Sequence, residues 1–171
     1  MQTISRLTGA AYGVHLSDQV ALVSVPLIAA LAFDASPELI GVLVACQSSA
    51  HLIGSIPFGI LVDQARLRLL MIWSALLLLV GAVGATVSVP LGFTFGFGTS
   101  VTIAGFGTVL FGLTALSIVP RVADAASLSS ANAAIEVPRA LCSFAVPLAV
   151  GLAIGDVPAR VIFAAAALGA G

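Results

Sequence analysis

Long apolar runs separated by short polar breaks dominate the hydropathy pattern of this chain. A helix needs about 20 predominantly apolar residues to cross a bilayer, because each residue rises about 1.5 Å through a hydrocarbon core about 30 Å thick. Five runs meet this requirement, and a sixth run of 11 residues is too short to span before the sequence stops. The predicted helices cover residues 9–33, 39–62, 69–89, 103–119 and 138–154, with an incomplete sixth at 161–171.

Composition identifies the solvent of these helices as lipid. Apolar residues make up 60% of the chain and charged residues only 8%, against about 45–50% and about 25% in a typical soluble domain. A soluble domain of this size cannot hide so much apolar surface. The pattern therefore predicts an all-α integral membrane protein in contact with membrane lipids, and we expect no cofactor.

Charge excludes several classes of function. The chain has no lysine, which excludes a lysine Schiff base and a phosphate-binding P-loop. A net charge of -1 with six scattered arginines argues against a nucleic-acid partner.

Arginine placement predicts how the helices are oriented. Cytoplasmic loops of membrane proteins are enriched in arginine and lysine. A cytoplasmic amino terminus puts Arg6, Arg66, Arg68 and Arg121 inside, with Arg139 near the inner end of the fifth helix and only Arg160 outside. We therefore predict a multi-pass protein of the cell (inner) membrane with its amino terminus in the cytoplasm.

The stretch G-I-L-V-D-Q-A-R-L-R, residues 59–68, concentrates charge between the second and third apolar runs. It resembles the G-x-L-x-D-R-x-G-R-K/R signature that the major facilitator superfamily carries between its second and third helices. The matching residues are Gly59, Leu61, Asp63 and Arg68, whereas Gln64 and Ala65-Arg66 depart from the signature. The segments SDQVALVSVPLIAAL and VPRVADAASLSSANAAIE look like the drug and siderophore exporters of that superfamily.

This resemblance implies a fold and a function. Family members have about twelve helices in two six-helix halves, so the chain would be the amino-terminal six-helix bundle of a secondary transporter, a fragment with a truncated sixth helix. The carboxy-terminal half is absent from this sequence, so the partner of the bundle would be that missing half or a second copy of the chain. The expected activity is export of a small-molecule substrate by alternating access. Of the family's antiporter signature in helix five, only Pro147 and Gly151 are kept.

The residues of the 59–68 stretch have physical roles that can be predicted separately. Gly59 lets another helix approach closely, and Asp63 is placed to cap the third helix. Arg66 and Arg68 can pair with carboxylates or anionic headgroups. In the family, the corresponding carboxylate helps to latch the two halves together. The alternative is a capped, positive-inside hairpin with no role in conformational change.

Polar side chains inside the apolar runs are the candidates for a substrate or proton pathway, because ionisable groups in a bilayer are costly and usually face a cavity or a partner. They form one stripe in the first helix and another in the second. Histidine titrates near neutral pH, which suits a proton-coupled cycle. The alternative is that these groups only hydrogen-bond between helices. The candidates are His15, Asp18, Gln19, Gln47 and His51.

Glu136 and Arg139 lie three residues apart, a spacing that predicts a local ion pair. If Pro138 begins the fifth helix, both charges lie at the membrane surface. If the helix begins near Asn132, Arg139 is one turn deeper and can reach Asp18. Two other prolines, Pro26 and Pro147, lie within apolar runs and are expected to bend their helices.

Two rival functions remain. An intramembrane enzyme has no support, since the chain lacks the H-E-x-x-H and G-x-S-x-G patterns and we predict neither a catalytic residue nor a metal site. A non-transporting membrane module that dimerises through small-residue helix faces is the second alternative.

Overall fold

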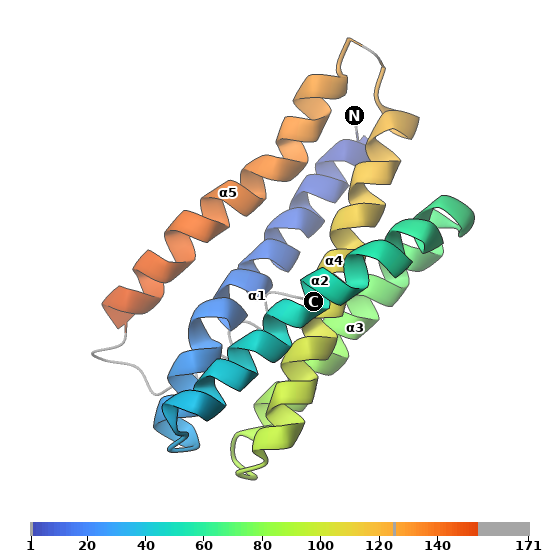
Figure 1. Ribbon diagram of the computed structural model, residues 1–171. Helices are drawn as coiled ribbons and strands as arrows, with labels where there is room; N and C mark the ends of the chain where they lie inside the picture. The colour runs from blue at the N-terminus through green and yellow to red at the C-terminus, as the bar shows by residue number, and fades with distance from the viewer. Residues whose placement is uncertain (1, 125, 154–171) are drawn as a thin grey trace.

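The computed structural model describes residues 2–124 and 126–153 (Figure 1). This part of the chain is all-helical, with α1 (Gln2–Ala32), α2 (Pro37–Gln64), α3 (Leu67–Ser88), α4 (Thr94–Val122) and α5 (Leu128–Ala153). All five helices are long and apolar enough to cross a membrane. This indicates a multi-pass membrane protein. The structure confirms five long apolar helices, one for each predicted full-length span. The predicted sixth helix, 161–171, lies outside the described residues.

Two helices begin about ten residues earlier than the hydropathy pattern predicts. Helix α4 begins at Thr94 and not at residue 103. Its first turns are glycine-rich, yet they pack closely: a Cβ on Gly98 would come within 2.9 Å of the Leu43 side chain. Helix α5 begins at Leu128 and not at residue 138, because Ala131 and Ile135 are buried in a core cluster. Tertiary packing extends both helices beyond their most apolar parts.

Helix α4 runs through the middle of the bundle, between α1 and α3 (Figure 1). Two of the apolar clusters each join four helices around it. One joins α1, α3, α4 and α5 through residues that include Leu7, Leu78, Phe111 and Ile135. The other lies toward the opposite end and joins α1, α2, α3 and α4, with Phe97 fully buried at its centre.

Glycine makes the contact between α3 and α4 close. A Cβ on Gly81 of α3 would lie 2.6 Å from the Ser100 carbonyl oxygen, and a Cβ on Gly107 of α4 would lie 2.8 Å from the Leu78 nitrogen. Neither position has room for a side chain, so the two backbones touch. In lipid, where burying apolar surface gives little drive, such close packing is the main attraction between helices.

The two ends of the bundle differ in charge. The amino terminus, the α2–α3 turn and the α4–α5 connection lie at one end, and the α1–α2 and α3–α4 connections lie at the other (Figure 1). The first end carries four arginines, whereas the connection at Asp34 and the start of α2 at Glu38 lie at the second. The arginines are Arg6, Arg66, Arg68 and Arg121. Which end faces the cytoplasm stays a prediction.

The corner between α2 and α3 differs from expectation in one respect. Helix α2 continues through Gln64, so Asp63 lies inside its last turn. The N-cap of α3 is Arg66, with no capping hydrogen bond from a side chain. The prediction that Asp63 caps α3 is therefore wrong, because the connection between the two helices is too short to leave Asp63 outside a helix.

The charged side chains of this corner are exposed. Asp63, Arg66 and Arg68 are all accessible, and none takes part in an ion pair within residues 2–124 and 126–153. A Cβ on Gly59 would meet nothing within 4 Å. The close helix contact expected at Gly59 is thus not made by the described part of the chain, and the corner is free to meet another surface.

Candidate functional site

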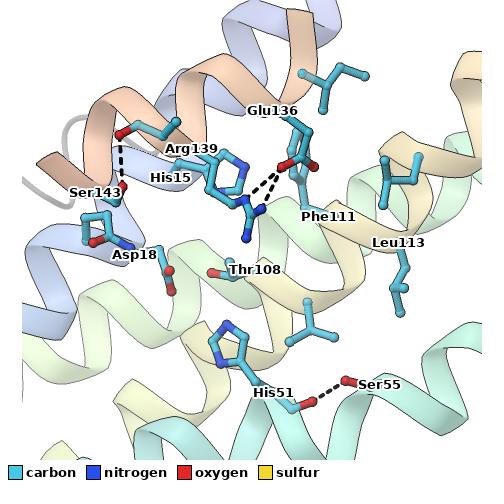
Figure 2. Close-up of a pocket in the computed structure, with 16 residues that line it drawn as sticks. His15, Asp18, His51, Ser55, Thr108, Phe111, Leu113, Glu136, Arg139 and Ser143 are labelled. Atoms are coloured by element: carbon cyan, nitrogen blue, oxygen red, sulfur yellow. Dashed lines mark hydrogen bonds and ion pairs between the residues drawn. The ribbon is translucent and has the colours of Figure 1, made fainter. Parts of the chain in front are cut away.

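A cavity of about 850 Å³ opens between α1, α2, α4 and α5. Figure 2 shows side chains from these four helices pointing into it. The polar residues in its wall are His15, Asp18, Gln19, His51, Ser55, Thr108, Glu136, Arg139 and Ser143. In so apolar a bundle, this is where ionisable side chains of different helices converge.

Helical spacing explains how the first wall forms. His15 and Asp18 are three residues apart on α1, and His51 and Ser55 are four apart on α2. Residues at these spacings share one face of a helix. Because α1 and α2 are antiparallel neighbours, their polar faces meet at one cavity.

Asp18 is the carboxylate in the α1 wall. It lies within electrostatic reach of both His15 and His51, and close to the Thr108 hydroxyl of α4. No ion pair links it to a cationic side chain in the part of the chain that the structure describes. The His15 ring packs edge-on against Phe111, with ring centroids 6.4 Å apart and an angle of 85° between the planes. Asp18 therefore lies within reach of two histidines and has no ion-pair partner among the described residues.

Glu136 and Arg139 form the part of the wall on α5, which packs beside α1. The Arg139 Nη2 lies 2.8 Å from the Glu136 Oε2, and Nε donates a hydrogen bond to the same oxygen at 2.9 Å. The spacing-based prediction of this pair is confirmed. Since α5 begins at Leu128, Pro138 lies well inside the helix, and Arg139 lines the same cavity as Asp18.

Gln47 lies elsewhere, which corrects the prediction that it lines the pathway. It is only 3% exposed, is not part of the cavity wall, and its Oε1 has no hydrogen-bond partner among the described residues. The reason is the close approach of α2 to α4 here: a Cβ on Gly105 would lie 3.3 Å from the Gln47 carbonyl oxygen. Where the two helices touch, no cavity remains.

The two prolines predicted to bend helices lie within continuous helices. Pro26 is inside α1 and Pro147 inside α5. Neither is among the residues that line the cavity.

Sequence reasoning named no cavity residue on α4. Thr108 and Phe111 face the cavity, as do Leu113 and Leu116. The fourth apolar run carries no charge to mark one face, and its small polar residues are evenly scattered. The missed signal was Thr108, a hydroxyl in mid-span opposite the polar stripes of the first two helices.

A second hollow of about 590 Å³ lies between α2 and α4. Its wall is mostly apolar and includes Leu39, Cys46 and Phe95. No cluster of three or more His, Cys, Asp or Glu side chains suited to a metal ion occurs in the described ranges. The polar cavity is therefore the candidate for chemistry with a solute.

No protein-family model matches the chain, and no curated protein sequence matches it significantly.

Proposed function

We propose that the chain is the amino-terminal half of a secondary active transporter of the major facilitator type, which exports a small molecule by alternating access. In that mechanism two bundles rock about a site near mid-membrane, which is exposed to each side in turn. The protein would reside in the cell (inner) membrane with its amino terminus in the cytoplasm, as the arginine-rich end of the bundle suggests.

The observation that carries this proposal is the polar cavity. Ionisable groups within membrane helices are costly, and they persist where they line a substrate or ion pathway. Here Asp18, His51 and Arg139 come from three helices and share one cavity, although single polar bonds between adjacent helices would suffice for packing. The open side of that cavity would be covered by the carboxy-terminal half.

The exposed α2–α3 corner supports the same arrangement. Asp63, Arg66 and Arg68 have no ion-pair partner in the described part of the chain, and the space beside Gly59 is open. We assign this corner as a conformational latch that contacts the other half. A hairpin held at the membrane surface by its arginines alone would leave Asp63 without a role.

One observation favours the alternative of a non-transporting module that dimerises. Gly41 and Gly59 both lie on α2 with open space beside them. They are 18 residues apart, which is about five full turns, so they lie on the same face of the helix. A partner helix could pack there in a homodimer as well as in a transporter. The tightest small-residue contacts, at Gly81 and Gly107, are however already used within the chain.

Transport can be tested without knowing the natural substrate. Everted membrane vesicles from cells that express the full-length gene convert export into uptake. Three fluorescent probes cover the charge classes: ethidium, a cation; carboxyfluorescein, an anion; and dansyl-lysine, a zwitterion. We expect at least one probe to accumulate, with accumulation abolished by a protonophore and by Asp18→Asn. Equal levels of all three probes in wild-type, Asp18→Asn and empty-vector vesicles would contradict the proposal.

A further inference from the structure

We propose that the polar cavity binds a small zwitterion, whose cationic group contacts Asp18 and whose carboxylate or phosphate contacts Arg139. The inference rests on the proposed function in taking this cavity as the substrate site. It adds the chemical class of the substrate, which the cavity's two opposed charges define.

The cationic end of the ligand is specified by the α1 wall. Asp18 has no ion-pair partner among the described residues, and the groups within its electrostatic reach are the imidazoles of His15 and His51 and the Thr108 hydroxyl. A carboxylate in this position gains most from an ammonium group, because a charge-assisted hydrogen bond is roughly twice as strong as a neutral one.

The anionic end is specified by Arg139. Both of its bonds to Glu136, from Nε and from Nη2, go to the single oxygen Oε2. The Nη1 group, with two N–H donors, takes part in no hydrogen bond or ion pair within residues 2–124 and 126–153. Figure 2 shows Asp18 from α1 and Arg139 from the neighbouring α5 both pointing toward the space beside Thr108. A guanidinium with one edge held and the other free is well suited to a carboxylate or phosphate.

The placement of charges in the cavity favours a zwitterion over simpler ligands. The carboxylates are Asp18 and Glu136, and the guanidinium is Arg139. A ligand that is only anionic would meet the uncompensated Asp18, and a ligand that is only cationic would leave the free edge of Arg139 unused. A zwitterion satisfies both walls without changing the net charge of the site.

The rest of the wall describes the body of the ligand. Between the charged walls, α4 presents Phe111, Leu113 and Leu116. Apolar side chains beside a few placed polar groups are typical of small-molecule sites. The cavity volume of about 850 Å³ accommodates a compact aromatic or branched aliphatic group between the two charges.

Three probes with the same aromatic body test the assignment: phenylalanine, a zwitterion; phenethylamine, which lacks the carboxylate; and 3-phenylpropionate, which lacks the amine. Their dissociation constants are measured on the full chain, purified in detergent, by isothermal titration calorimetry. Each charge-assisted contact contributes about 1.5–3 kcal/mol, which corresponds to roughly a tenfold or larger change in affinity. We therefore expect phenylalanine to bind at least about tenfold more tightly than either truncated probe.

Variants identify which protein side chain contacts which end of the ligand. In Asp18→Asn the advantage of phenylalanine over 3-phenylpropionate should disappear, and in Arg139→Gln its advantage over phenethylamine should disappear. Glu136→Gln releases Arg139 and should tighten binding of 3-phenylpropionate. Ser130→Ala is the matched control, because this exposed serine of α5 lies outside the cavity wall and donates its hydroxyl to the Ser127 carbonyl, and it should leave all three affinities unchanged.

Three results would overturn the assignment: equal affinity for phenethylamine and phenylalanine, an unchanged preference in Arg139→Gln, or no binding of any probe at millimolar concentration. These failures are separable from failure of transport. Protonophore-sensitive accumulation of ethidium alone, without zwitterion binding, would support transport but with a different class of substrate. Zwitterion binding without gradient-driven accumulation would support the binding site but contradict transport.

Discussion

Gly107 of α4 lies directly against the backbone of α3 at Leu78, where a Cβ would come within 2.8 Å of the Leu78 nitrogen and 2.9 Å of the Ser74 carbonyl oxygen. Backbone atoms cannot move aside as a flexible side chain can. The contact between α3 and α4 therefore depends on the absence of a side chain at this position.

Substituting Gly107→Ala should accordingly destabilise the bundle by about 1–3 kcal/mol, the usual cost of overpacking. Thermal unfolding in detergent, followed by circular dichroism, measures the effect. Gly41→Ala is the control, since nothing lies within 4 Å of a Cβ there. It should be neutral, or stabilising by up to about 1 kcal/mol, because alanine favours a helix more than glycine does. Equal melting temperatures for the two variants would show that the α3–α4 contact is looser than described.

Asp34 ends the first helix in a left-handed backbone conformation, with φ at 46°. The turn is held by backbone hydrogen bonds from Phe33 and Ala35 to carbonyls of α1. Left-handed backbone costs a non-glycine residue about 1–2 kcal/mol, so Asp34→Gly should be more stable than Asp34→Ala by about 1 kcal/mol. The same unfolding experiment compares them, and an Asp34→Ala variant as stable as Asp34→Gly would count against this turn geometry.

Two glutamines at similar depth provide a matched pair. Gln47 is buried with an unpartnered Oε1, whereas Gln19 lines the cavity. Removing an unsatisfied polar group from an apolar site recovers about 1–3 kcal/mol, so Gln47→Leu should keep transport and match or exceed the stability of the wild type. Gln19→Leu should reduce transport with little change in stability. Loss of probe accumulation in vesicles with a folded Gln47→Leu variant would indicate that Gln47 belongs to the transport pathway.

The α2–α3 corner is tested by Asp63→Asn, which keeps the shape of an exposed side chain and removes its charge. As a latch residue, Asp63 should affect the rate of transport by about tenfold or more and leave probe affinity unchanged. Vesicle accumulation rates and calorimetric affinities separate the two quantities. Gln64→Glu, a neighbouring exposed change of charge, serves as the control. Normal transport rates in Asp63→Asn would favour a hairpin without a role in conformational change.

Much of the fold could be predicted from hydropathy, because a bilayer allows few alternatives to apolar helices. The limits of the helices could not. Hydropathy treats the glycines before residue 103 as breaks, yet Gly98 is where α4 packs against Leu43 of α2. The polar residues near Asn132 interrupt the apolar pattern, yet Ile135 anchors that part of α5 in the core.

The candidate site could be predicted from the sequence only in part. Helical spacing brought His15 to the same face as Asp18, because that relationship lies within one helix. It could not show that α2 touches α4 at Gln47, or that Thr108 faces Asp18, because these depend on how three helices cross. Asp63 failed as a helix cap for a related reason: the limit of α2 decided its place.

Thiol labelling in intact cells tests the central claim, a bundle of membrane-crossing helices with its arginine-rich end in the cytoplasm, most directly. In a background with Cys46→Ala and Cys142→Ala, Gln64→Cys marks the α2–α3 end and Leu91→Cys marks the opposite end; both positions are exposed. A membrane-impermeant maleimide should label Leu91→Cys in intact cells and Gln64→Cys only after permeabilisation. Labelling of Gln64→Cys but not of Leu91→Cys in intact cells would contradict the account.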